Sequence, residues 1–466
     1  MIFIKDVNAV TLDPKNEIIK NAGIVIDHDR IIDIGKASEL TPQYKDVEVI
    51  KGRGMLALPG FIDAHSHSDQ AILRSFADDM GWKPYLEDFI WPLIGHREQE
   101  DALISLKLCM LEMLKSGTTT FVDCMISSRY DFDKLAQAVV DMGMRAVLAK
   151  YLMPDSIFSQ KEKAINTGEV ESEEQSRSDF EQAIKTWNGT AGGRLQVWLG
   201  PFVPRGDPAP DIKPDFFHKV SGLAASHNTG ITIHFASERE DIQFFQQEYG
   251  MQPVEFAQQY GLLGSNVMLI NGCQLTEEEI PVLAETDTKI VHSPSANMKM
   301  ASGIAKIPQM RAAGVTVALG CDAGANNNCL DMIREMKAAS LLHNISMMDP
   351  KALIAEDVLE MATIDGARAI GQEDEIGSLE VGKQADIILV DLHHPHTMPV
   401  HDPVANLVYA AHGGNVDTVI VAGRVLMKNR KVLVVDEEAI LAEAEERGHA
   451  LLKRAGIRVA PEWPIE

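Results

Sequence analysis

The fold is decided by the stretch Leu58-Pro59-Gly60-Phe61-Ile62-Asp63-Ala64-His65-Ser66-His67. An apolar run leads into it, a Pro-Gly pair interrupts it, and two histidines stand two residues apart at its end. Side chains alternate between the two faces of a β-strand, so His65 and His67 are expected on the same face. Two imidazoles on one face at a strand end are typical of a metal site. The remaining ligands are therefore expected at the ends of other strands.

Beyond His67, apolar strands alternate with stretches of helical periodicity. Residues 100–116 carry apolar side chains at helical spacing and stop at Gly117, and a strand over 118–123 follows. Eight strands counted from residue 56, most followed by a helical stretch, indicate an α/β protein with a TIM (β/α)8 barrel. That fold places its active site at the carboxyl ends of the strands.

Both ends of the chain differ from this pattern. Residues 1–55 contain short β-branched runs separated by turn residues, and similar strands return after residue 370. We predict that residues 1–55 and 370–430 form one small β-sandwich domain beside a barrel over 56–369. A Glu-rich amphipathic helix and a tail are predicted for 431–466.

The composition limits the possible partners and location. The chain has 466 residues, 45% of them hydrophobic and 24% charged, which is ordinary for a globular protein. Its formal net charge of −25 repels phosphate, so neither nucleic acid nor an anionic membrane is expected as a partner. No apolar run reaches the roughly 18 residues of a membrane span. The first residues do not show the basic segment followed by an apolar segment that is typical of a secretory signal. Five cysteines without C-x-x-C spacing favour a reduced, cytoplasmic protein.

Two further ligand candidates lie at predicted strand ends. His234 is near the end of the apolar run 230–236, and Asp322 ends the run 315–322. Taken singly, His234 could be a core histidine and Asp322 the cap of a following helix. Four candidates at the catalytic face of one barrel favour a metal site instead. Three imidazoles and a carboxylate suit Zn²⁺ or Fe²⁺, and such a metal lowers the pKa of a bound water for hydrolysis.

Further segments accompany these ligands: 59–67, Leu73-Arg74 with Asp78-Asp79, Ile90-Trp91-Pro92, 112–120, 292–297, Asn327-Asn328 and 377–386. In these segments the chain resembles the amidohydrolase superfamily, in the branch of chlorotriazine hydrolases and deaminases of adenosine analogues and guanine. The resemblance implies one divalent metal, Zn²⁺ before Fe²⁺, with Asp322 both ligating it and accepting a proton. The implied ligands are His65, His67, His234 and Asp322. The strand-four segment 197–201 offers no lysine to bridge a second metal, and relatives of this kind are commonly dimers or larger, so a homo-oligomer is expected.

Two positions depart from the pattern of that branch. Its deaminases usually carry a glutamate three residues after the strand-five histidine, where this chain has Ser237, with Glu238 one residue later. They also carry a histidine at the end of strand six, where this chain has Asn271. Asn271 can donate a hydrogen bond but cannot become a cation. Asp322, Glu238 and Asn271 are therefore the catalytic candidates, and ordinary purine deamination is in question.

We predict a metal-dependent hydrolase that attacks a C–N bond, or a related leaving-group bond, of a small cyclic or amide substrate. The alternatives are an amino-heterocycle deaminase with a rearranged acid residue, and an inactive barrel that serves as a binding protein. Retention of all four ligand candidates argues against the inactive barrel. Trp82, Tyr85 and Trp91 are candidates for an apolar substrate wall, although packing at the barrel top explains them equally well. Asn271 and His292 complete the expected substrate contacts.

Overall fold

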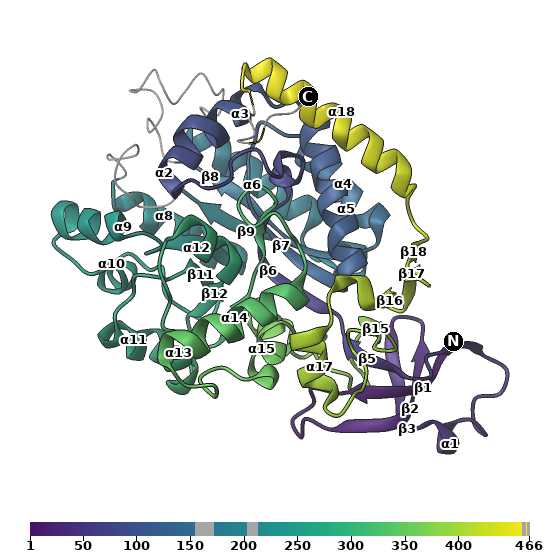
Figure 1. Cartoon of the computed structure of the whole chain (residues 1–466). Helices are drawn as coiled ribbons and strands as arrows, with labels where there is room; N and C mark the ends of the chain where they lie inside the picture. Colours follow the sequence, from purple (N-terminus) through teal and green to yellow (C-terminus); the bar gives the residue numbers. More distant parts are fainter. Residues whose placement is uncertain (154–171, 203–212, 459–462, 464–466) are drawn as a thin grey trace.

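The computed structural model describes residues 1–153, 172–202, 213–458 and 463, and within them the chain forms two nine-stranded sheets (Figure 1). One sheet is parallel, and its strands neighbour one another in chain order. They are β6 (Phe61–His67), β7 (Thr118–Ile126), β8 (Arg145–Leu152), β9 (Leu195–Pro201), β10 (Ile231–Phe235), β11 (Val267–Asn271), β12 (Lys289–His292), β13 (Val317–Leu319) and β14 (Asp322–Ala323).

The parallel sheet closes into a barrel at its eighth strand position, which two short strands share. β13 pairs with β12, whereas β14 pairs with β6, so the two pieces together fill the eighth strand position within the described ranges. The break falls at Gly320 and Cys321. A Cβ on Gly320 would lie 2.8 Å from the Cβ of His65 and 2.9 Å from its backbone nitrogen, so only glycine lets the strands approach this closely. The predicted TIM barrel is confirmed.

Helices surround the barrel and follow its strands (Figure 1). The outer ones are α4 (Gln99–Ser116), α5 (Phe132–Met142), α6 (Glu173–Trp187), α8 (Asp215–His227), α10 (Pro253–Gln259), α11 (Ile280–Glu285), α13 (Ile307–Ala312), α14 (Met332–Met347), α15 (Ala355–Met361) and α16 (Ile364–Ala369). Shorter segments follow the strand ends: η1 (Ser68–Leu73), α2 (Trp82–Pro84), η2 (Tyr85–Ile90), α3 (Trp91–His96), α9 (Arg239–Phe244), η3 (Phe245–Tyr249) and α12 (Pro294–Met300). Helix α4 ends at Gly117, whose φ of 96° is left-handed, as the sequence predicts.

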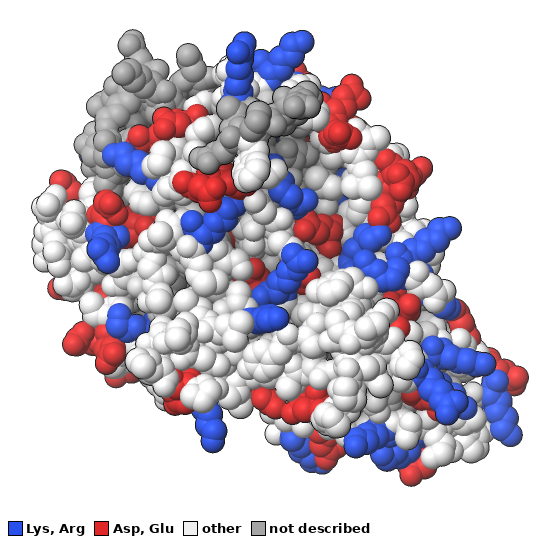
Figure 2. Space-filling view, in the orientation of Figure 1, with Lys and Arg blue, Asp and Glu red and all other residues white. Residues whose placement is uncertain are grey.

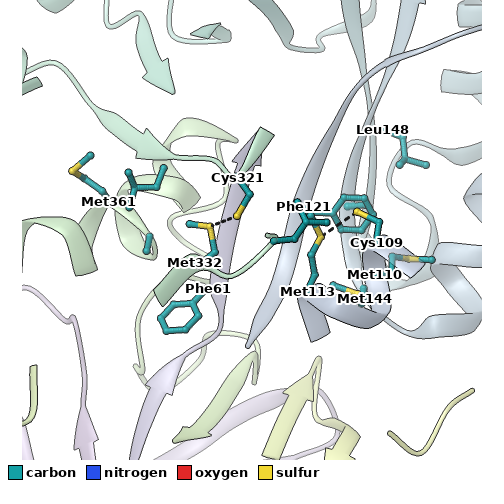
Figure 3. Packing of buried hydrophobic residues seen from close by; sticks show 14 of the residues in the cluster. Phe61, Cys109, Met110, Met113, Phe121, Met144, Leu148, Cys321, Met332 and Met361 are labelled. Atoms are coloured by element: carbon teal, nitrogen blue, oxygen red, sulfur yellow. Dashed lines mark hydrogen bonds between the residues drawn. The ribbon is translucent and has the colours of Figure 1, made fainter. Parts of the chain in front are cut away.

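Sulfur-containing side chains fill part of the space between the barrel and its helices (Figure 3). The Cys321 thiol lies 3.5 Å from the Met332 sulfur, and the Cys109 thiol lies 3.9 Å from that of Met113. Methionine adapts to irregular gaps, and the first of these contacts packs α14 against the break in the eighth strand.

The second sheet is built from both ends of the chain and forms the small β-domain at the lower right of Figure 1. Its strands are β1 (Ile2–Val10), β2 (Ile18–Asp27), β3 (Arg30–Lys36), β4 (Glu48–Lys51), β5 (Met55–Pro59), β15 (Ile387–Asp391), β16 (Val416–Val421), β17 (Arg424–Lys428) and β18 (Lys431–Val432). The two ends join where β15 pairs antiparallel with β5, and Ile4, Ile24 and Ile387 share one buried core. The exact domain boundaries stay a prediction.

Helix α18 (Glu437–Ala455) lies on the outside of the barrel, next to α4 (Figure 1). Arg454 forms an ion pair with the buried Asp101 of α4, which fixes this contact. No helix in the described part of the chain is long and apolar enough to cross a membrane.

Candidate active site

Four side chains converge at the carboxyl ends of three barrel strand positions. His65 and His67 end β6, His234 lies on β10, and Asp322 begins β14. The Nε2 atoms of His67 and His234 are 3.3 Å apart. Asp322 Oδ1 lies 3.5 Å from His65 Nε2 and 3.7 Å from His67 Nε2. The ligating atoms of the three histidines all lie within 4.8 Å of one another.

These separations suit one small divalent metal. Zinc–nitrogen bonds of 2.0–2.1 Å in a tetrahedron place neighbouring ligand atoms about 3.4 Å apart. The measured spacings of 3.3, 3.5 and 3.7 Å lie close to that value. The donor set of imidazoles and one carboxylate therefore fits Zn²⁺ or Fe²⁺ in both chemistry and size.

The backbone around this cluster is strained in a way that aims side chains at it. Four strand-end residues have left-handed φ angles: Met125 at 63°, Ala236 at 46°, Asn271 at 75° and Asp322 at 65°. Each such conformation costs about 1–3 kcal/mol and is typical of functional sites. Asn and Asp tolerate it best, which suits the residues at 271 and 322.

Charge around the cluster is set by burial and by the neighbouring rings. Burial opposes ionisation of Asp322, but His65, His67 and His234 outweigh it and hold the pKa of this carboxyl well below its usual range. Burial and the neighbouring His65 lower the pKa of His67 to about 4, so its ring is neutral and able to ligate. Behind them, Asp63 accepts hydrogen bonds from the amides of His65 and Cys321, and burial raises its pKa to about 6.

A cavity opens above the cluster, and the free space in it and at its mouth, open solvent included, is about 1100 Å³. Its polar part includes His67, His234, Asp322, Glu238 and Asn271. The rest of the wall is mainly apolar and contains the three aromatic residues that the sequence suggested, Trp82, Tyr85 and Trp91, together with side chains that sequence reasoning did not select. The apolar and aromatic wall residues are Trp82, Tyr85, Leu86, Ile90, Trp91, Ile94, Met125, Tyr151, Phe202 and Met300.

The two positions that depart from the deaminase pattern lie together in this wall. Asn271 Nδ2 donates a hydrogen bond to Ser237 Oγ at 3.2 Å. Its amide oxygen is buried without a hydrogen-bond partner among the described residues, and its second N–H remains available as a donor. Asp241 Oδ2 accepts hydrogen bonds from the amides of Ser237 and Glu238 at 2.9 and 3.0 Å, which fixes the loop after β10. Glu238 is buried and lines the cavity.

The structure does not bring His292 to the cavity. It is fully buried, and its Nε2 lies 3.1 Å from Nε2 of His343 on α14. Val291 belongs to the apolar cluster inside the barrel, so alternation along β12 turns His292 outward. The same alternation rule, applied to the sequence, would have found this orientation.

The sequence pattern of the amidohydrolase family matches residues 56–426. The chain belongs to the amidohydrolase family. It is 38% identical to the 5-methylthioadenosine/S-adenosylhomocysteine deaminase of Pelotomaculum thermopropionicum, over 97% of this chain and 99% of that protein.

Two solved structures have the same fold over almost the whole chain. The adenosine deaminase of Xanthomonas campestris with bound zinc has a TM-score of 0.90 at 26% identity, covering 97% of this chain and 98% of that one. The atrazine chlorohydrolase of Arthrobacter aurescens TC1 in complex with zinc has a TM-score of 0.87 at 26% identity, covering 96% and 100%. The predicted superfamily and branch are confirmed.

This amidohydrolase is therefore an enzyme that hydrolyses carbon–nitrogen bonds with a divalent metal. Tyr151, Phe202 and Met125 are among the cavity residues that sequence reasoning missed. Each lies at or just beyond the carboxyl end of a barrel strand, so the strand-end rule that selected the ligands would also have selected them.

Proposed function

We propose that this amidohydrolase is a hydrolytic deaminase of amino-substituted, nucleoside-like heterocycles. The observation that carries the proposal is one cavity that joins the ligand cluster, the carboxyl group of Glu238 and a large aromatic wall. A carboxyl group beside the attack site supplies acid catalysis, and the wall suits a flat ring. The likeness to adenosine-analogue deaminases over 97% of the chain supports the same substrate class.

One metal ion would be held by His65, His67, His234 and Asp322. When bound, it supplies a water molecule whose pKa is lowered towards 7. We propose Zn²⁺ first and Fe²⁺ second, with a single ion per chain. The ligand spacings near 3.4 Å and the zinc-bound structural relatives support this choice.

In the proposed reaction the attacking water forms a C–O bond to the ring carbon, and the C–N bond to the amino group then breaks. Asp322 accepts the proton of the water and delivers it to the leaving amine, which departs as ammonia. Glu238 donates a proton to the adjacent ring nitrogen and regains one from the hydroxyl group of the adduct as the C–N bond breaks, which leaves the ring carbonyl product. Asn271 contacts the substrate through a neutral hydrogen bond. General acid–base steps of this kind each contribute about 10²-fold to 10⁴-fold in rate.

Hydrolysis of a different leaving group is the second candidate function. It is favoured by Ser237 and Asn271, which replace the acid and the imidazole that a purine deaminase usually employs. A substrate with a better leaving group needs less proton donation. The structural likeness to an atrazine chlorohydrolase is consistent with this alternative.

An assay of products separates these functions. The zinc-loaded protein is incubated with adenosine, 5′-methylthioadenosine, guanine, an aminotriazine, a chlorotriazine and a simple amide, and ammonia, chloride and amine release are measured. We expect ammonia from the nucleosides and none from the Asp322→Asn variant. Chloride or alkylamine release without ammonia favours the second candidate. A metal-loaded protein that turns over none of them indicates an inactive binding barrel.

We further propose a cytoplasmic homo-oligomer that binds small molecules and no nucleic acid. The net charge of −25 supports the exclusion of nucleic acid. Light scattering during size-exclusion chromatography tests the assembly, and a filter-binding assay with duplex DNA at low salt tests the exclusion.

A further inference from the structure

Glu335 is a buried acid that the proposed reaction does not use. Acidic side chains are spread over the surface of the protein, as Figure 2 shows for one face, whereas Glu335 on α14 has only 1% of its area exposed. It is not one of the described residues that line the cavity. A carboxylate is seldom buried unless hydrogen bonds or an opposite charge compensate for the lost water, so its partners indicate what it does.

Both oxygens of Glu335 accept hydrogen bonds from segments that lie near the ligand cluster. Oε1 accepts from Nδ2 of Asn327 at 2.9 Å, and Oε2 accepts from the backbone amide of Ser295 on α12 at 3.2 Å. The same Nδ2 of Asn327 donates its second hydrogen to the carbonyl oxygen of Cys321 at 2.7 Å. Glu335 therefore orients the amide of Asn327, and that amide holds the peptide bond directly before Asp322.

The residue before Asp322 is fixed from other sides as well. The backbone amide of Cys321 donates a hydrogen bond to Asp63 Oδ1 at 2.9 Å. Its thiol lies 3.5 Å from the sulfur of Met332 on α14, as Figure 3 shows. Together with the bond from Asn327, these contacts engage the amide, the side chain and the carbonyl of one residue. Cys321 therefore has little freedom to rotate.

The peptide bond after Asp322 is held in the same manner. The amide of Ala323 donates a hydrogen bond to Oδ1 of Asn326 at 3.0 Å. A peptide unit is planar, so a hydrogen bond to either its C=O or its N–H restrains the whole unit. The two neighbouring asparagines, Asn326 and Asn327, thus restrain the peptide planes on both sides of Asp322, and these planes define its φ and ψ angles.

These restraints explain how Asp322 keeps its left-handed conformation. Its φ is 65°, in a region that residues with a side chain adopt only occasionally. A rotation of either flanking peptide would relieve the strain and turn the carboxylate away from the histidines. At present its Oδ1 lies 3.5 Å from His65 Nε2 and 3.7 Å from His67 Nε2. Such strain persists only where the surrounding groups hold it in place.

We propose that Asn327 is a positioning residue for Asp322 and that Glu335 acts through Asn327. The pair keeps the carboxylate of Asp322 facing the three histidines and contacts neither the metal nor the substrate itself. This inference rests on the proposed function, in which Asp322 ligates the metal and accepts the proton of the water. Groups that orient metal ligands in this way change metal affinity or activity by about 10-fold to 100-fold when they are removed.

The Kd for Zn²⁺ and the separate values of kcat and KM test this role. Asn327→Ala should weaken Zn²⁺ binding by about 10-fold to 100-fold, measured by competition with a chelator, and should lower kcat while KM stays unchanged. Asn344 is the matched control, because it is also half-buried and its side chain also forms two hydrogen bonds, with Ser340 and with the amide of Leu353. Asn344→Ala should lower the thermal midpoint of the metal-free protein by a similar amount but leave the Zn²⁺ affinity unchanged.

A second variant tests whether Glu335 acts through Asn327. Glu335→Met keeps the length of the side chain and removes both acceptor oxygens, so it should weaken Zn²⁺ binding by about tenfold. In the Asn327→Ala background the same change should alter the Zn²⁺ affinity by less than about twofold, because the amide that transmits the effect is already absent. Asn327→Leu keeps the volume of the asparagine side chain and takes the place of Asn327→Ala if the alanine variant does not fold.

The outcomes separate this role from the proposed function. Parent values of Zn²⁺ affinity and kcat in the Asn327 variant overturn the positioning role and leave the deaminase proposal standing. Equal losses of affinity in the Asn327 and Asn344 variants show a general loss of stability and also overturn it. Losses that multiply in the double variant show that Glu335 does not act through Asn327. If Asp322→Asn itself binds Zn²⁺ and turns over like the parent, the role of Asp322 in the proposed function is wrong.

Discussion

The two sides of the cavity differ in how closely they keep the pattern expected of a deaminase. On the β6–β14 side, His65, His67 and Asp322 are all present, and Asp63 ties the two strands together by accepting from the Cys321 amide. On the β10–β11 side, Ser237 and Asn271 stand where that pattern has an acid and an imidazole, and Glu238 follows one residue later. In the proposed reaction, the residues that activate water are thus kept, whereas those that protonate the substrate differ.

Removing the metal should have the largest effect on activity, because the attacking water is then no longer activated. Dialysis against a chelator should lower kcat by about 10⁴-fold or more, and one equivalent of Zn²⁺ per chain should restore it. Elemental analysis of the His67→Ala variant should show loss of bound metal, whereas the exposed His28→Ala control keeps it. Two tightly held ions per chain would contradict the single-metal site.

Asp322→Asn should be nearly as severe while leaving the fold intact. An amide is a poor ligand here and cannot accept the water proton, so kcat should fall by about 10³-fold to 10⁴-fold. The exposed Asp46→Asn change in the β-domain is the matched control. Circular dichroism checks folding, and near-normal turnover would mean that another residue, with Glu238 the first candidate, is the base.

Glu238→Gln tests whether Glu238 donates the proton to the substrate. We expect this change to lower kcat for deamination by about 10²-fold. The glutamine keeps the size of the side chain, so KM should change little. Adding Ser237→Glu to this variant returns an acid to the position usual in the family and should restore part of the rate. A Glu238→Gln protein with unchanged kcat would show that this carboxyl group does not donate the proton.

The double change Ser237→Glu with Asn271→His should have a smaller effect. If Glu238 already supplies the proton, kcat/KM for adenosine should stay within about threefold of the parent value. A rise of about tenfold or more would instead indicate that the natural site is adapted to a substrate with a better leaving group. Each single change serves as the control for the pair.

The ligands could be predicted from the sequence because local motifs and the strand-end rule both select them. The bending of β6 that brings their side chains together could not be predicted from the sequence. Ile62 and Ala64 lie in the apolar cluster inside the barrel, and strict alternation would then turn His65 outward. The pairing with β7 is irregular between Asp63 and Ser66, and such bulges re-aim the side chains that follow.

Contacts between distant segments could also not be predicted from the sequence. The left-handed backbone of Asp322 and Asn271 depends on how the strand ends are held by the rest of the barrel. The apolar wall is assembled from η2, α3 and the ends of several strands, and no single segment indicates it. His343 lies 51 residues after His292, so nothing local predicted that the two rings face each other.

The smallest effect concerns these two histidines, and it decides whether His292 belongs to the substrate site. Burial holds the pKa of His292 well below its ordinary value and lowers that of His343 to about 4. Unfolded histidine has a pKa of about 6.5, so the unfolded chain takes up protons that the folded chain refuses as the pH falls from 6.5 towards 4. The stability that the neutral pair contributes is therefore full above pH 6.5 and is lost below it.

His343→Gln removes one of the two groups, so the parent should be the more stable protein at pH 8. The difference in free energy of unfolding should then shrink by about 1.4 kcal/mol for each pH unit below 6.5. Thermal midpoints at pH 8, 6 and 5 check this, with the exposed His449→Gln as control. KM should not change in the His343→Gln variant, and a several-fold rise in KM would return His292 to the substrate site.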